Sequence, residues 1–181
     1  MGDFMENRDI VNLFKKIGEL KNIKRAGWVR YEIPNPESVA DHSFRCAFMA
    51  MVLGDILKVD SLKLMKMAIL HDIAEAVTGD ITPVSGITRE EKLKKEEEGL
   101  AGLLNDLPNG KEYITLWKEY EEGETREARI FKDIDKLEMA LQALEYQDTF
   151  PDIEVSEFLL ASDEQINIPE VRSLFEKLKK E

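Results

Sequence analysis

Apolar residues recur at a helical spacing along almost the whole chain. In the segment from about residue 7 to 23, Ile10, Val11, Phe14, Ile17 and Leu20 share one side of a helix, which we expect to be buried. The alternation of apolar and polar residues that marks a half-buried strand is not sustained anywhere. The pattern therefore predicts an all-α fold.

The predicted helices have recognisable ends. Ser38 is a favoured N-cap for a helix that reaches about residue 57, and Phe44, Phe48 and Met51 lie on its apolar side. Gly79 suits the end of a helix that begins near residue 61. Further helices are expected at about 88–105, 112–121, 125–148, 156–160 and 169–179. No linker interrupts the chain, so we expect one domain over residues 1–181, a bundle of about six to eight helices.

The acidic charge of the chain limits its partners. Its 181 residues include 37 Asp and Glu against 25 Lys and Arg, a net charge of −12. Because nucleic-acid-binding proteins present a basic face, we expect no such partner. No apolar run approaches the ~20 residues of a membrane span, which predicts no membrane partner. Cys46 is the only cysteine, and the N-terminus lacks a signal pattern, so we expect a cytoplasmic location.

The two histidines of the chain both lie in helical segments beside chemically useful neighbours. His42 stands near the start of the helix predicted from Ser38, and His71 is followed by Asp72. On a continuous helix His71, Asp72 and Glu75 would share one face, because Glu75 follows His71 by four residues and Asp72 by three. Two imidazoles with carboxylates form a mixed nitrogen and oxygen shell, which suits a borderline transition metal or magnesium.

A fourth ligand is expected from the helix predicted at 125–148. Asp133 and Asp135 both flank the apolar line of that helix, and periodicity alone does not choose between them.

The set His42, His71-Asp72 and Asp135 resembles the H…HD…D ligands of the HD-domain metal-dependent phosphohydrolases. Within that superfamily, Glu75-x-x-x-Gly79-Asp80 resembles the 5'-deoxynucleotidase branch. The resemblance implies a helical HD domain that holds a divalent ion (Co, Mn, Zn, Fe or Mg) through these four ligands. It also selects Asp135 over Asp133, which we then expect to be solvated.

The resemblance further implies roles around the metal. Asp72 and Glu75 would be catalytic, with Glu75 taking a proton from the attacking water. Asp80 would accept a hydrogen bond from the sugar 3'-hydroxyl or, with Glu75, hold a second ion. Ile81 would lie beside the sugar, where an apolar wall disfavours a 2'-hydroxyl.

The phosphate-binding arginine departs from the family pattern. The resembling bacterial enzymes carry an arginine immediately before the tryptophan that corresponds to Trp28, but Gly27 stands there in this chain. The nearest arginines are Arg25 and Arg30, and we expect Arg25 to take the role. Arg25 and Trp28 are therefore predicted substrate contacts.

The function implied is a metal-dependent phosphomonoesterase that hydrolyses deoxyribonucleoside 5'-monophosphates. Two alternatives stay open: another HD-type nucleotide phosphohydrolase or phosphodiesterase for cyclic or alarmone nucleotides, and a non-catalytic helical interaction module stabilised by the metal. Glu75 and Asp80 favour an enzyme, because a structural site needs neither. The relatives are commonly dimers, and we expect a homodimer through helix faces away from the site.

Overall fold

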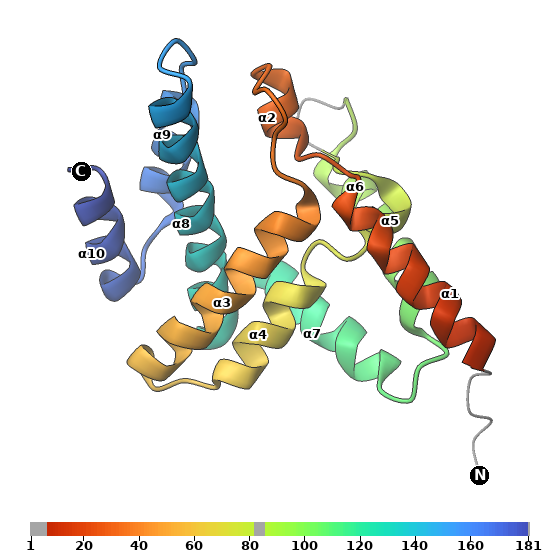
Figure 1. Ribbon diagram of the computed structural model, residues 1–181. Coiled ribbons are helices and arrows are strands. Elements are labelled where there is room, and N and C mark those ends of the chain that lie inside the picture. The colour runs from red at the N-terminus through yellow and green to blue at the C-terminus, as the bar shows by residue number, and fades with distance from the viewer. Residues whose placement is uncertain (1–6, 82–85, 181) are drawn as a thin grey trace. The chain divides into compact units, whose positions relative to one another are not determined.

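The computed structural model describes residues 7–81 and 86–180 (Figure 1). Throughout these residues the secondary structure is helical, and the pairing of Lys24 with Ser38 is an isolated bridge rather than a strand. The predicted all-α fold is thereby confirmed. Among the described residues no helix is both long enough and apolar enough to span a membrane.

The residues group into two compact units. The first comprises residues 1–43 and 69–118, and the second comprises residues 44–68 and 119–181, with the undescribed residues excepted. The prediction of a single domain over residues 1–181 stays a prediction.

The first unit packs a short helix between two longer ones. The helix α1 (Asn7–Ile17), which is continued by the 3-10 turn η1 (Gly18–Lys21), contacts α5 (Glu75–Thr78). On its other side α5 contacts α6 (Arg89–Leu104), and Gly99 of α6 lies beside Thr78 and Val77 of α5. The start of α6, predicted at about residue 88, is fixed by the cap Thr88, which forms a capping box with Glu91.

The helix predicted over residues 61–79 is interrupted. Helix α4 (Ser61–Leu70) stops one residue before His71, and residues 71–74 form turns before α5 begins. The bonds here link residues three apart: Ile73 N–H donates to Leu70 O at 3.2 Å and Glu75 N–H to Asp72 O at 3.0 Å. This tighter winding corrects the expectation of a continuous helix. The predicted end at Gly79 is confirmed, with a φ of 73°.

Another short helix, α2 (Ala26–Arg30), lies in the segment expected to be a loop, and most of α7 (Gly110–Glu122) also belongs to the first unit.

The second unit is organised along the longest helix, α8 (Arg126–Thr149). Helices α9 (Ser156–Gln165) and α10 (Pro169–Leu178) pack along it (Figure 1). Asp133, which was expected to be solvated, is instead buried and accepts the backbone N–H groups of Asn167 and Ile168 at 2.7 and 2.5 Å. It therefore anchors the start of α10.

Arg45 of helix α3 (Val39–Leu57) makes three hydrogen bonds to side chains of α8. Arg45 Nε donates to the fully buried Glu138 at 2.8 Å, Nη1 donates to Glu145 at 2.8 Å, and Nη2 donates to Gln142 Oε1 at 2.7 Å. The three acceptors lie on successive turns of α8, so a single guanidinium holds two turns of the neighbouring helix.

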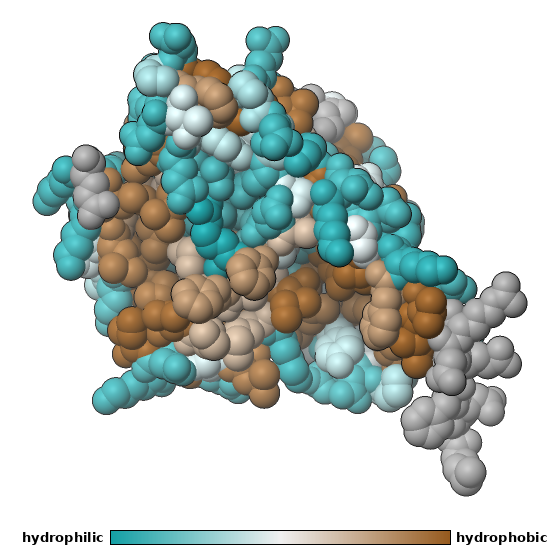
Figure 2. Space-filling view, viewed as in Figure 1, coloured by the Kyte–Doolittle hydropathy of each residue, from teal (hydrophilic) through white to brown (hydrophobic). Residues whose placement is uncertain are grey.

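Two predicted apolar faces are exposed in part. On α3 the inward side is formed by residues such as Cys46, Ala50 and Leu53, whereas Phe44 and Phe48 of the predicted apolar side are exposed. Cys46 is thus a buried thiol that forms no disulfide. On α1, Val11 and Phe14 are exposed as well. The space-filling view shows apolar side chains gathered on the outer face of α3 (Figure 2).

Candidate active site

The two histidines meet in the first unit. His42 Nε2 and His71 Nε2 are 3.2 Å apart, and both residues are buried. Asp72 Oδ2 lies 3.0 Å from His71 Nε2 and 3.8 Å from His42 Nε2. Ligands around a tetrahedral Zn²⁺ with bonds of ~2.0–2.1 Å would be about 3.3 Å apart. The spacing of the two imidazole nitrogens therefore fits a shared cation.

Hydrogen bonds within the first unit hold the two histidines in place. His42 lies in the first turn of α3, where Ser38 and Asp41 form the cap: the Asp41 N–H donates to Ser38 Oγ at 3.2 Å, and the Ser38 N–H donates to Asp41 Oδ2 at 2.8 Å. His71 follows the end of α4, and its carbonyl accepts the indole N–H of Trp117 at 3.2 Å. The sequence did not indicate that Trp117 supports His71. The hydrogen bond joins residues that are 46 positions apart, and no local spacing in the sequence predicts such a bond.

Arg25 lies against the carboxylate of Asp72. Its Nη1 is 3.4 Å from Asp72 Oδ2, and its Nε is 3.8 Å from Glu37 Oε1. Burial opposes the charge of Asp72, but the imidazole of His71 and the guanidinium of Arg25 outweigh it and hold the pKa of Asp72 well below its usual range. Asp72 is therefore ionised at neutral pH.

The segment after Arg25 is tied to the loop after α5. The backbone N–H of Ala26 donates to Asp80 Oδ2 at 2.7 Å. Trp28 is almost fully buried, and its indole N–H donates to Glu37 Oε1 at 2.8 Å. The structure thus brings Arg25, Asp72 and Asp80 close together. Ile81, which directly follows Asp80, is partly exposed. Glu37, which links Trp28 to Arg25, is a further residue that no spacing in the sequence indicated.

Glu75 is a buried carboxyl group with unmet hydrogen-bonding capacity. Only 3% of the residue is exposed, and among the described residues Oε2 has no hydrogen-bond partner. Burial and the carboxylates of Asp72 and Asp80 raise the pKa of Glu75 to about 10, against the opposing charges of Arg25 and Lys92. A cation bound beside Glu75, Asp72 and Asp80 would offset the repulsion between their carboxylates.

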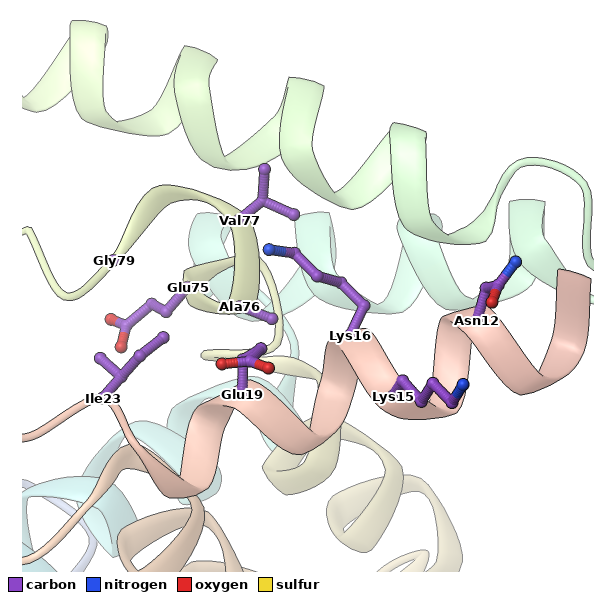
Figure 3. A pocket seen from close by; sticks show the side chains of 9 residues that line it. All are labelled: Asn12, Lys15, Lys16, Glu19, Ile23, Glu75, Ala76, Val77 and Gly79. Carbon is purple, nitrogen blue, oxygen red and sulfur yellow. The ribbon is translucent and has the colours of Figure 1, made fainter.

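Glu75 is also accessible from a cavity between α1, η1 and α5. Figure 3 shows Glu75 beside Ile23 at one end of the cavity and Asn12 at the other, with Lys16 reaching toward Val77. The cavity measures about 460 Å³, within the range of small-molecule sites. The lining residues are Asn12, Lys15, Lys16, Glu19, Ile23, Glu75, Ala76, Val77 and Gly79.

Asp135, the fourth predicted ligand, belongs to the second unit. It lies on α8 and is buried, and Lys136 Nζ donates to its Oδ2 at 2.9 Å. Its place in a shell with His42, His71 and Asp72 stays a prediction.

Comparisons with known proteins agree on one family. The HD domain family model matches residues 17–172. The chain is 44% identical over 146 residues to the 5'-deoxynucleotidase HDDC2 of Dictyostelium discoideum, covering 76% of this chain and 77% of that protein. It is 37% identical to the human 5'-deoxynucleotidase HDDC2 over 177 residues, covering 96% and 86%. A conserved hypothetical protein from Pyrococcus furiosus is similar in structure, with a TM-score of 0.80, 35% identity and coverage of 94% and 99%.

Proposed function

The chain belongs to the HD-domain family, and we propose that it is a metal-dependent 5'-deoxynucleotidase that releases phosphate from deoxyribonucleoside 5'-monophosphates. This is the activity predicted from the sequence. Relatives named 5'-deoxynucleotidase at 36–44% identity, over most of both chains, confirm it. The observation in the structure that supports it best is the convergence of His42, His71 and Asp72 beside Arg25 and Glu75.

The proposed ligands of the ion are His42, His71, Asp72 and Asp135. The imidazole and carboxylate donors of the first three already lie within 3.0–3.8 Å of one another. When bound, a divalent cation supplies Lewis acidity to the phosphate and the attacking water. The identity of the ion is open among Co, Mn, Zn, Fe and Mg, because a mixed set of nitrogen and oxygen ligands accepts all of them.

Glu75 would carry the proton of the reaction. As a carboxylate it accepts a proton from the attacking water while the water oxygen bonds to phosphorus. The bond between phosphorus and the 5'-oxygen then breaks, and Glu75 returns the proton to that oxygen to give the deoxynucleoside. This role requires that the bound cation lower the raised pKa of Glu75.

Arg25 would neutralise the charge of the phosphate. Its contacts to Asp72 and Glu37, at 3.4 and 3.8 Å, are long for charge-assisted hydrogen bonds, so a phosphate dianion can compete for the guanidinium. Because Trp28 is buried, we propose that it acts through Glu37 by fixing this segment.

The loop after α5 would contact the sugar. Asp80 commits Oδ2 to Ala26, which leaves Oδ1 to accept the 3'-hydroxyl, with Ile81 beside the sugar. A second ion held by Glu75 and Asp80 is the alternative use of the same carboxylates.

The test is phosphate release from all deoxyribo- and ribonucleoside 5'-monophosphates with a series of divalent ions. We expect hydrolysis of the deoxynucleotides, and none with His71→Ala. Glu90→Ala on the exposed side of α6 is the matched control and should keep the parent rate. Activity only on cyclic or alarmone nucleotides would favour a different HD phosphohydrolase. A protein whose melting temperature depends on metal, but which hydrolyses nothing, would favour the interaction module.

The remaining predictions concern partners and location. We propose a cytoplasmic homodimer that binds neither nucleic acid nor membrane, and the net charge of −12 supports the absence of a nucleic-acid partner.

A further inference from the structure

The cavity between α1, η1 and α5 has two regular walls within the first unit. One wall is formed by side chains that recur every three or four residues and so share one face of α1 and η1: Asn12, Lys16, Glu19 and Ile23. The other wall is formed by α5 and includes Ala76 and Val77. In Figure 3 Glu75 lies beside Ile23 at one end of the cavity, and Lys16 reaches across from α1 toward Val77.

The end of the cavity beside Glu75 is where a nucleoside would leave the reaction. Glu75 is 3% exposed, and its Oε2 has no hydrogen-bond partner among the described residues, so a ligand is expected to supply one. In the proposed function Glu75 returns a proton to the 5'-oxygen of the sugar. Gly79 also lines the cavity and directly precedes Asp80, the proposed contact of the 3'-hydroxyl. With the sugar placed at this end, the cavity is the protein-lined space that continues beyond it.

The size and the walls of this space suit a nucleobase. The volume of about 460 Å³ lies within the range of small-molecule sites. Lys16 and Ile23 are seven residues apart, or about 10–14 Å along α1 and η1, which is long enough for a sugar and a base. Ile23 on one side and Ala76 and Val77 on the other provide apolar walls, between which a planar ring can lie flat.

The polar groups of the cavity offer a donor beside an acceptor. The ammonium group of Lys16 has no ion-pair or hydrogen-bond partner among the described residues. Glu19 follows three residues later, at ~5–6 Å between Cβ atoms on a helix. Its Oε2 accepts a hydrogen bond from Asn22 Nδ2 at 3.3 Å, which leaves Oε1 to accept another.

Among the DNA bases, guanine matches this pair of groups best. It presents O6 and N7 as acceptors, and lysine commonly donates to both. Beside O6, guanine carries a ring N–H and an exocyclic amino group, and a carboxylate can accept from both. Adenine has an amino group at position 6 instead of an oxygen, so it would place a donor against the ammonium group of Lys16.

We propose that the cavity between α1, η1 and α5 is the subsite for the base of the substrate, and that Lys16 and Glu19 make this subsite prefer guanine. Lys16 donates to O6 and N7, and Glu19 accepts from N1–H and the 2-amino group. The position of the sugar in this proposal rests on the proposed function. The preference itself rests on the side chains of the cavity.

The first experiment compares kcat/KM for dGMP and dAMP. The parent should prefer dGMP by about 10-fold. Lys16→Glu replaces the donor by an acceptor, so it should lower kcat/KM for dGMP and raise it for dAMP until the order is reversed. The control is Lys21→Glu, which makes the same change of charge at an exposed residue of η1 outside the cavity, and it should keep the parent ratio.

The same comparison separates the subsite from simpler roles of Lys16. If Lys16→Glu lowered kcat/KM equally for both substrates, Lys16 would only attract their negative charge, and the proposal would be overturned. An unchanged ratio in Lys16→Glu would overturn it as well. Either result, obtained with a parent that hydrolyses deoxynucleotides, leaves the proposed function intact.

The second experiment measures binding of nucleosides by calorimetry and needs no hydrolysis. The parent should bind deoxyguanosine more tightly than deoxyinosine, which lacks the 2-amino group, and Glu19→Ala should bind both equally. A parent that binds deoxyguanosine no more tightly than deoxyinosine or deoxyadenosine would overturn the subsite alone. A protein that shows the expected preference in binding but hydrolyses no deoxynucleotide would retain the subsite and refute the proposed function.

Discussion

Replacing Glu75 by glutamine should stabilise the metal-free protein. The group titrates near 4.5 when free in water and near 10 in the fold. Between these values the unfolded chain loses the proton and the folded chain keeps it, so stability falls as pH rises. At pH 7 the loss amounts to about 3 kcal/mol, at ~1.36 kcal/mol for each pH unit above the unfolded pKa. Glutamine removes this loss and keeps the shape of the side chain.

The effect has a characteristic dependence on pH. At pH 4.5 Glu75→Gln and the parent should be equally stable, and the difference should grow by ~1.4 kcal/mol for each pH unit above it. For a chain of this size, about 3 kcal/mol at pH 7 corresponds to a rise in Tm of ~6–12 °C.

The assay is thermal and urea unfolding of chelator-treated protein at pH 5, 6, 7 and 8. Glu90→Gln, an exposed glutamate on α6, is the control and should show no such trend. The metal-loaded Glu75→Gln enzyme should nevertheless turn over ~10²-fold more slowly, because it lacks the base. A variant that is no more stable than the parent at pH 8 would refute the reasoning, since Glu75 would then be ionised in the fold.

Three further predictions follow from the same structure. His71→Ala should abolish both bound metal, measured by elemental analysis, and phosphate release, because a shell that loses a strong ligand binds weakly; stoichiometric metal in the variant would contradict the ligand assignment. Arg45→Met should lower the free energy of unfolding in urea by about 3–5 kcal/mol, because the buried carboxylate of Glu138 loses the guanidinium that pairs with it, and adding Glu138→Leu should restore part of the loss. Asp80→Asn should lower kcat/KM alike for a matched deoxy- and ribonucleotide, whereas Ile81→Gly should narrow the gap between them; a ratio that changes only in Asp80→Asn would place the selectivity on the 3' side of the sugar.

The ends of several helices were predictable because their signals are local. Thr88 and Glu91 are three residues apart and form the capping box that such a spacing favours. Ser38 caps α3 in the same way, and Gly79 ends α5 with a positive φ. Each of these signals depends on neighbours within one turn, so a single sequence contains all of the information.

The interruption at residues 71–74 was not predictable from periodicity. The apolar spacing continues through Ile73 and Ala76, so the sequence resembles one helix from residue 61 to 79. The residues wind more tightly after Leu70, and the bond from Trp117 to the carbonyl of His71 supports that turn from a distant part of the chain. The prediction that Asp133 is solvated was wrong for a similar reason, because its hydrogen-bond partners lie 34 and 35 residues away in the sequence.

The apolar side of α3 shows a different limit of pattern analysis. Periodicity detects that a helix has apolar residues in register, but it does not distinguish a face that packs inside the chain from one that packs against another molecule. On α3 one apolar face is buried and another is exposed, and the bonds from Arg45 to α8 decide which one points inward.

The segment around Gly27 shows how the chain manages without the arginine that the resembling enzymes carry at this position. The N–H of Ala26 is held by Asp80, and the indole of Trp28 is held by Glu37, so the backbone from residue 26 to 28 is fixed on both sides of Gly27. Arg25 extends from the start of that segment to Asp72 at 3.4 Å. An arginine two positions earlier therefore brings its charge to the carboxylate beside His71 without a side chain at position 27. Because the same segment is tied to Asp80, any change that releases Ala26 should disturb the proposed phosphate contact of Arg25 and the proposed sugar contact of Asp80 together.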